Sequence, residues 1–151
     1  MNPRVVFDCV VFLQAAARPD GPAGACLRAL DAGDLTLYIS SEILLEVRDV
    51  LQRPKLRQRF PTLPPGNVDN ILQNIQSKSL LIAFVPPVCS LPRDPKDEPY
   101  LNLAIAAQAS YLVTRDRDLL DLMADTGFRQ RFPDLQILEP PEFLRALKVA
   151  R

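Results

Sequence analysis

Short runs of apolar, β-branched and aromatic residues alternate along this chain with longer segments that have the apolar spacing of helices. We predict strands over residues 4–7, 35–39, 80–85, 111–114 and 135–138. Helices are predicted over residues 21–30, 41–53, 67–77, 101–109, 118–123 and 140–147. Such alternation is typical of a mostly parallel sheet with helices on both faces. We therefore predict an α/β protein with a three-layer α/β/α arrangement.

Length and composition exclude several classes of protein. The chain has 151 residues, the usual size of one domain, and no long linker divides it, so we predict one domain over residues 1–151. Histidine is absent, which excludes Ser-His-Asp and Cys-His nucleophile systems and histidine-based zinc motifs. The formal net charge is zero, which argues against a polycation that coats nucleic acid or membranes.

Cysteine usage and hydropathy indicate a cellular compartment. The chain has three cysteines and no C-x-x-C motif, a pattern that suits free thiols in a reducing compartment. No run of about 18 apolar residues is present, and the first residues lack the apolar region of a signal peptide. We therefore expect a cytoplasmic protein that does not span a membrane.

Two aspartates follow predicted strands. Asp8 comes directly after the strand over residues 4–7, and Asp116 closes the strand over residues 111–114. In open α/β sheets, ligands bind beyond the carboxyl ends of the strands, so both side chains should lie at one edge of the sheet. The alternative is that each aspartate only caps the helix that follows it.

Two further acids can reach that edge. Glu46 lies at the border of the apolar stripe that Ile43 and Val47 form on one helix, so it can face the strand ends or the solvent. Asp97 belongs to an acidic cluster over residues 94–98, immediately before the most apolar helix. It can cap that helix, but three acids in five residues exceed what a cap needs.

If Asp8, Glu46, Asp97 and Asp116 converge, their charges repel one another strongly. Such carboxylates either stay partly protonated or hold a divalent cation. Oxygen ligands without histidine or cysteine suit Mg²⁺ or Mn²⁺. Ions of this kind activate water and stabilise the transition state of phosphodiester cleavage.

Four segments have the order and separation of the acidic motifs of a known family. They read VVFD at residues 5–8, SSEILLEV at 40–47, RDPKDEPY followed by LAIAA within 93–107, and YLVTRDRDLL at 111–120. On these segments, which extend over nearly the whole chain, the protein resembles PIN-domain ribonucleases. It is most similar to the VapC-type toxins of toxin–antitoxin systems.

The resemblance implies a PIN-like fold and Mg²⁺-dependent cleavage of RNA by water, which leaves 5′-phosphate and 3′-hydroxyl ends. It also implies an antitoxin partner and a homodimer. The metal-site roles that it implies fall on Asp8, Glu46, Asp97 and Asp116. Asp94 and Asp118 match further acidic positions of related sequences, with less defined roles.

One position departs from the family pattern. The first motif of the family usually reads Asp-Thr-Asn-Val, whereas this chain reads Asp8-Cys9-Val10-Val11. Valine cannot position a carboxylate or a water as the asparagine amide does. One alternative is therefore a catalytically weakened PIN-like module that binds RNA or protein. Another is a phosphotransferase or phosphatase with an aspartyl nucleophile, although such enzymes commonly have a second aspartate where Val10 stands.

Basic residues that could grip RNA phosphates gather in one part of the chain. The candidate RNA-binding residues are Arg48, Arg53, Lys55, Arg57, Arg59 and Arg115. The first five form the densest basic run, which could equally be the solvated end of a helix. Thr114 could add a hydroxyl near the metal, although a threonine in this position is more often only a good strand former.

Overall fold

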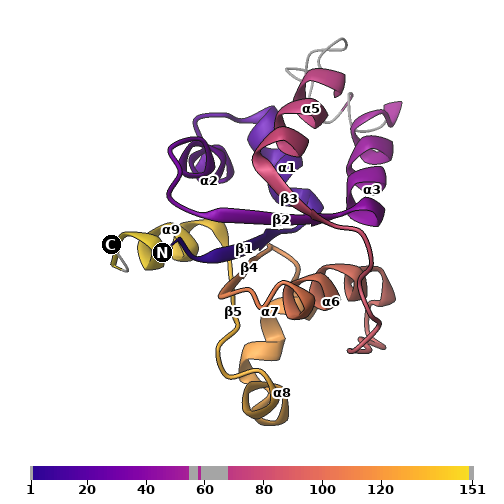
Figure 1. Ribbon diagram of the computed structural model, residues 1–151, viewed down its shortest axis with the longest axis vertical. Coiled ribbons are helices and arrows are strands. Elements are labelled where there is room, and N and C mark those ends of the chain that lie inside the picture. The colour runs from indigo at the N-terminus through magenta and orange to yellow at the C-terminus, as the bar shows by residue number, and fades with distance from the viewer. Residues whose placement is uncertain (1, 55–57, 59–67, 150–151) are drawn as a thin grey trace.

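The structure is a computed structural model that describes residues 2–54, 58 and 68–149 (Figure 1). Its strands are β1 (Arg4–Phe7), β2 (Thr36–Ser40), β3 (Ser79–Ile82), β4 (Tyr111–Val113) and β5 (Gln136–Leu138). The helices comprise α1 (Cys9–Ala17), α2 (Pro22–Asp31), α3 (Ser41–Leu51), α5 (Val68–Lys78), α6 (Glu98–Ala106), α7 (Arg117–Leu120), α8 (Thr126–Arg131) and α9 (Pro140–Val149). Short 3-10 turns lie at Pro95–Asp97 and Asp121–Ala124.

The five strands form one sheet in the order β3-β2-β1-β4-β5, and each neighbouring pair is parallel. Val5 of β1 lies opposite Leu37 of β2 and Tyr111 of β4, so β1 is at the centre. From β1 the chain first adds β2 and β3 on one side and later β4 and β5 on the other. The carboxyl ends of β1 and β4 therefore meet at the point where ligands bind in sheets of this kind.

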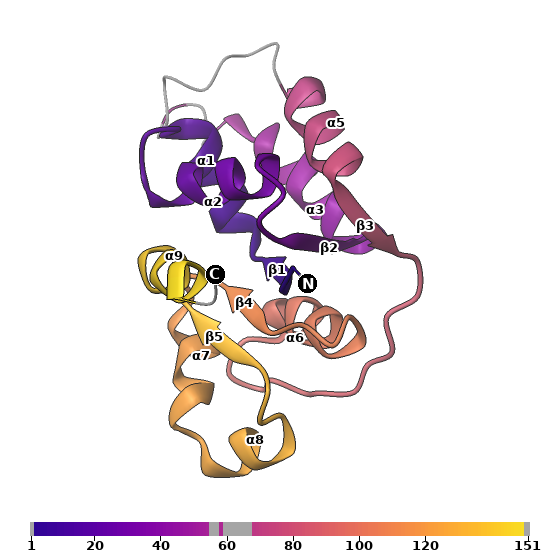
Figure 2. The same ribbon diagram turned by 60° about the vertical axis from the view of Figure 1, so that its left-hand side comes forward.

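Helices cover both faces of the sheet. In Figures 1 and 2, α1, α2, α3 and α5 lie on one side, and α6 lies on the other. The Phe7 ring contacts Phe12 of α1 and Phe143 of α9 edge to face, with ring centroids 5.8 and 6.1 Å apart, so α9 shares the α1 face. On the opposite face, α6 contacts β1, β2 and β4. The three-layer α/β/α arrangement predicted from the sequence is confirmed.

Several elements differ from the sequence prediction, among them the short helix α8, which was not predicted. Residues 9–17 form α1, which was not predicted, because this segment is apolar nearly all round and lacks the polar face that reveals a helix. The strand predicted over residues 80–85 is shorter and ends at Ile82. Ile82 pairs with Ser40, the last residue of β2, so the next residues have no strand beside them.

No helix within the described ranges is both long enough and apolar enough to cross a lipid bilayer.

Candidate active site

Asp8 and Asp116 follow the neighbouring strands β1 and β4 at the carboxyl edge of the sheet. The backbone nitrogen of Asp8 donates a hydrogen bond to the carbonyl of Val113 at 2.9 Å, which extends the pairing of β1 with β4 by one residue. Each aspartate also caps the helix after it: Asp8 accepts from the nitrogen of Val10 at 3.4 Å, and Asp116 from that of Asp118 at 2.8 Å. Both aspartates can therefore cap a helix and belong to the site at the same time.

Thr114 connects the two aspartates. Its side-chain hydroxyl donates a hydrogen bond to Asp8 Oδ2 at 2.6 Å and accepts one from the backbone nitrogen of Asp116 at 3.0 Å. The side chain is completely buried, and its backbone nitrogen is bound to the carbonyl of Leu138. Sequence reasoning favoured a plain strand role for Thr114. The sequence signal for its role is the position of its hydroxyl, at the end of a strand and two residues before a site aspartate.

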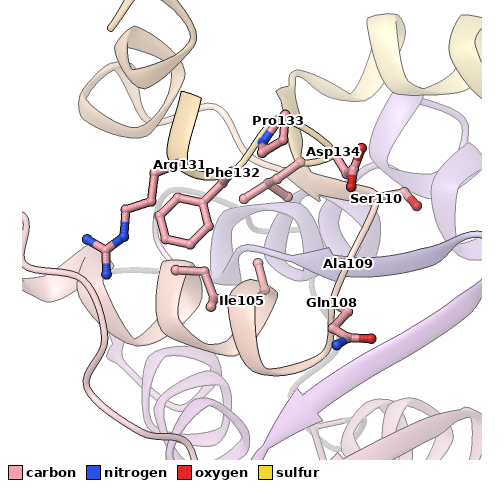
Figure 3. A pocket seen from close by; sticks show the side chains of 10 residues that line it. Ile105, Gln108, Ala109, Ser110, Arg131, Phe132, Pro133 and Asp134 are labelled. Atoms are coloured by element: carbon pink, nitrogen blue, oxygen red, sulfur yellow. The ribbon is translucent and has the colours of Figure 1, made fainter. Parts of the chain in front are cut away.

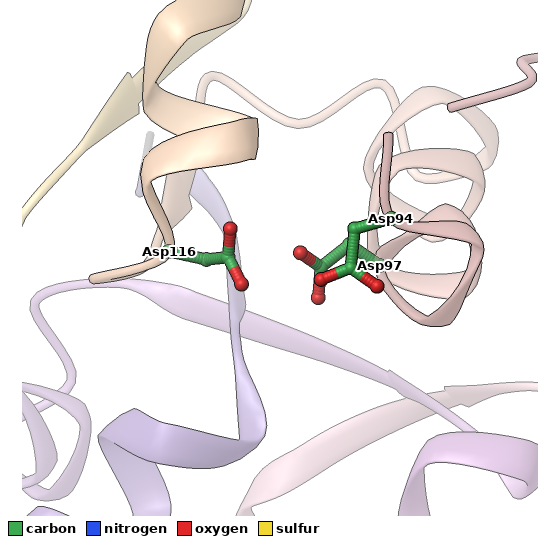
Figure 4. A group of neighbouring side chains, drawn as sticks. All are labelled: Asp94, Asp97 and Asp116. Carbon is green, nitrogen blue, oxygen red and sulfur yellow. The ribbon is translucent and has the colours of Figure 1, made fainter. Parts of the chain in front are cut away.

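Three aspartates come closest together at this edge. One carboxylate oxygen from each of Asp94, Asp97 and Asp116 lies within 4.8 Å of the other two. Figure 4 shows Asp116 on one side of the site and the other two facing it from the opposite side. Asp8 and Glu46 lie outside this group of three. Asp94, which the sequence offered only as a further candidate, is thus in the centre.

Asp97 is buried, with 7% of its surface exposed, and its Oδ2 atom lacks a hydrogen-bond partner among the residues that the structure describes. It occupies the position before the first turn of α6, but its side chain makes no capping hydrogen bond there. A buried carboxylate oxygen without a partner is costly, so it requires a function or a ligand. The capping role considered from the sequence does not explain Asp97.

The loop that carries Asp94 is tied to α6 by two side chains one helical turn apart. Asn102 Oδ1 accepts a hydrogen bond from the backbone nitrogen of Cys89 at 2.7 Å. Glu98 Oε1 accepts one from the backbone nitrogen of Leu91 at 2.9 Å. Helix α6 begins directly after Asp97. The loop and the helix therefore bring the carboxylates of Asp94 and Asp97 together, opposite Asp116.

Burial and mutual repulsion disfavour the charged forms of these acids. Burial, followed by the interactions with Asp116, Asp8 and Asp94, raises the pKa of Asp97 to about 8. The pKa of Asp8 is also raised, mainly by burial and less by Asp116, although the hydrogen bonds from Thr114 and Val10 oppose the shift. A cation between the carboxylates would relieve both effects, because it replaces lost solvation and offsets the repulsion.

Glu46 approaches the site from α3. It is half-buried, and its pKa is raised by burial and by the Asp8 and Glu42 carboxylates, while contact with the Tyr100 hydroxyl lowers it. The helix begins at Ser41 because the Ser40 hydroxyl accepts a hydrogen bond from the backbone nitrogen of Ile43 at 3.1 Å. Asp8 is thus one of the charges that act on Glu46, and Glu46 is not a member of the group of three aspartates.

Asp118 has another partner. Its carboxylate forms an ion pair with Arg93 at 2.7 Å, and Arg93 also lies 3.4 Å from Asp121. Its backbone nitrogen donates a hydrogen bond to Asp116 Oδ1, so Asp118 supports the site through its main chain. The structure does not bring the Asp118 side chain into the central group.

Val10 stands where the first motif of the family has asparagine. Its apolar side chain is 37% exposed. Only the backbone nitrogen of Val10 serves the site, as the weak donor to Asp8. The side chain therefore offers no polar atom to the carboxylates.

The predicted RNA-binding residues that the structure describes have different surroundings. Arg48 is exposed, whereas Arg53 pairs with Asp49 at 2.7 Å. The Arg115 Nε atom donates a hydrogen bond to Gln14 at 2.6 Å. The remaining three, Lys55, Arg57 and Arg59, lie outside the described residues.

A cavity of about 770 Å³ lies elsewhere, beyond the carboxyl end of α6 (Figure 3). Arg131 stacks over the Phe132 ring at 5.0 Å in its lining, and Asp134 is the one acid among its described lining residues. The candidate active site is assigned to the aspartates because their chemistry, rather than cavity size, suits a reaction at phosphate.

Comparison with known proteins agrees with this geometry. The model of the PIN domain family matches residues 4–118, a range that contains the three central aspartates as well as Asp8 and Glu46. The chain is 29% identical over 147 residues to the uncharacterized protein MJ1680 of Methanocaldococcus jannaschii, covering 93% of this chain and 89% of that protein. No solved structure matches. PIN domains are generally nucleases and typically use a divalent metal ion. This chain belongs to the PIN domain family.

Proposed function

We propose that this protein is a metal-dependent endoribonuclease and the toxin of a toxin–antitoxin pair. The observation that carries the proposal is the group Asp94, Asp97 and Asp116 at the ligand-binding edge of a PIN domain, with a buried Asp97 oxygen that lacks a partner within the described chain. The similarity of the four acidic motifs to VapC-type toxins supports the narrower part of the proposal.

The residues present fit a hard divalent cation. Every side chain of the group offers carboxylate oxygen, the ligand that Mg²⁺ and Mn²⁺ prefer. Asp94, Asp97 and Asp116 would hold the ion, and Asp8 and Glu46 would complete the acidic surroundings on the other side. A bound ion would supply an activated water and would stabilise negative charge on the phosphate.

The protein's own groups then have distinct tasks. Thr114 fixes the orientation of Asp8 and places the backbone before Asp116. Glu46 orients the attacking water and can accept its proton at a carboxylate oxygen. The water oxygen bonds to phosphorus, the bond from phosphorus to the 3′-oxygen breaks, and a proton passes to that oxygen.

The partners follow from the same proposal. RNA phosphates would contact Arg48 and Arg115 together with the basic run that includes Lys55, Arg57 and Arg59. The VapC-type resemblance favours a homodimer that an antitoxin protein inhibits. The cysteine usage favours a location in the cytoplasm.

Cleavage of end-labelled single-stranded RNA by the purified protein tests the proposal. The reaction would be run with Mg²⁺, with Mn²⁺ and with EDTA, and for the double variant Asp8→Asn/Asp116→Asn. The exposed Asp134, beside the distant cavity, provides a matched control as Asp134→Asn. We expect metal-dependent cleavage by the wild type and the control and none by the double variant. Cleavage that persists in EDTA or in the folded double variant would contradict the proposal.

A second candidate, a weakened module that binds RNA or protein without cleaving it, is favoured by one observation. Val10 supplies no polar side chain where the family has asparagine. RNA binding without cleavage, by a protein that still binds Mn²⁺, would favour this candidate.

A further inference from the structure

Tyr100 lies in the first turn of α6, three residues after Asp97, and is 1% exposed. Its hydroxyl oxygen is buried and makes no well-formed hydrogen bond to any part of the chain that the structure describes. A tyrosine hydroxyl in such a place normally has a partner, because losing its hydration without a hydrogen bond costs stability. A phenylalanine would fill the same volume without that cost. The hydroxyl therefore requires an explanation that packing of the ring does not provide.

The surroundings of the hydroxyl are acidic. It interacts with the Cys9 thiol and with the carboxylates of Glu46 and Asp8. Asp8 and Cys9 directly follow β1, and Glu46 belongs to α3. Burial, and then Glu46 and Asp8, raise the pKa of the Cys9 thiol to about 12, so this neighbour stays neutral. Burial likewise raises the pKa of Tyr100 itself, so the phenol keeps its proton and remains a donor. The carboxylates are the acceptors that match a phenol donor best.

Among the described residues, no ion pair or other hydrogen bond holds the Glu46 carboxylate in place. It is half-buried next to Asp8, and the nearby Glu42 carboxylate also repels it. Arg53 is a favourable charge in its surroundings, but its guanidinium is paired with Asp49. Without a donor, the long Glu46 side chain would turn toward solvent and away from Asp8. A donor on the buried side would keep it at the site.

We propose that Tyr100 is a positioning residue whose hydroxyl donates a hydrogen bond to Glu46 and holds this carboxylate beside Asp8 when a cation binds. The inference rests on the proposed function, because Glu46 must belong to the acidic surroundings of the cation. The Tyr100 hydroxyl and the Glu46 carboxylate already affect each other's pKa, the hydroxyl lowering that of Glu46 and the carboxylate raising that of Tyr100. Tyr100 touches neither substrate nor cation.

Calorimetric titration of the full chain with Mn²⁺, after EDTA treatment and dialysis, tests the inference without measuring activity. The variants are Tyr100→Phe, Glu46→Gln and their combination. Tyr111→Phe is the matched control, because the Tyr111 ring packs on Phe143 instead. We expect Tyr100→Phe to weaken Mn²⁺ binding about tenfold, as the loss of a hydrogen bond to a charged group does. In the Glu46→Gln background it should change binding by less than about twofold.

The outcomes separate the two proposals. If the wild type binds Mn²⁺ and Tyr100→Phe binds it equally well, the positioning role is wrong and the metal site stands. An equal loss with and without Glu46→Gln also overturns the role, because the effect then does not pass through Glu46. Wild-type protein that binds no Mn²⁺ overturns the metal site and the positioning role together. Far-UV circular dichroism verifies that each variant is folded.

Discussion

The Thr114 hydroxyl lies 2.6 Å from the carboxylate of Asp8, a residue 106 positions away in the chain, and it connects the ends of β4 and β1. The same hydroxyl accepts a hydrogen bond from the backbone nitrogen of Asp116. One buried side chain thus holds both the carboxylate of Asp8 and the backbone of Asp116.

Replacing Thr114 with valine keeps the shape of the side chain but removes the donor. We expect Thr114→Val to lower the free energy of unfolding by about 1–3 kcal/mol, because Asp8 loses its strongest hydrogen bond in a buried place. Mn²⁺ affinity should also fall. Urea unfolding and calorimetry measure the two effects, and Thr114→Ser, which keeps the hydroxyl, is the control. Equal stability of the valine and serine variants would refute the role of the hydroxyl.

The stability of the metal-free protein should depend on pH through Asp97. Its folded-state pKa is about 8, above the ordinary value of 3.8, so the folded protein binds the proton more tightly than the unfolded chain. The contribution of this group is fully present below about pH 4 and is lost as the pH rises through 8. We expect Asp97→Asn to raise the free energy of unfolding at pH 8 by about 2 kcal/mol.

Urea unfolding in EDTA at pH 5 and pH 8 measures this dependence for the wild type and for Asp97→Asn. The difference between the two proteins should be much larger at pH 8 than at pH 5. Saturating Mg²⁺ should remove the loss of stability of the wild type at pH 8, because the ion then compensates the charge. A difference that does not change with pH would show that Asp97 is not the responsible group.

Asp94 and Asp118 should differ in their effect on metal binding. Asp94 belongs to the central group, whereas Asp118 is paired with Arg93. We expect Asp94→Asn to weaken Mn²⁺ binding about tenfold or more and Asp118→Asn by less than about threefold, since an exposed ion pair contributes little. Calorimetry on both variants checks the difference, and a larger loss in Asp118→Asn would mean that the two acids have exchanged roles.

Val10→Asn restores the residue type that the family has at this position. The side chain is partly exposed, so the free energy of unfolding should change by less than about 0.5 kcal/mol. We expect kcat/KM for RNA cleavage to increase several-fold, because an amide can position a carboxylate or a water. Val10→Ala is the control. Unchanged kcat/KM in the asparagine variant would show that valine does not limit this enzyme.

Local patterns predicted most of the fold. The strands and the larger amphipathic helices were recognisable because each has a periodicity of its own, and parallel pairing follows from their alternation. Residues 9–17 escaped recognition because a short helix with few polar residues has no distinguishing period. The end of β3 was misplaced because it depends on the length of β2, which lies elsewhere in the chain.

For the site, the sequence by itself determined that acids without histidine follow the strands of a parallel sheet, since strand ends and residue types are local properties. Only the tertiary structure decided which acids meet. It brings Asp94 into the central group through the loop that Asn102 holds, and it directs Asp118 to Arg93. It also places Tyr100 beside Glu46. These distances depend on how loops and helices pack, and spacing along the chain carries no information about contacts between elements that are distant in sequence.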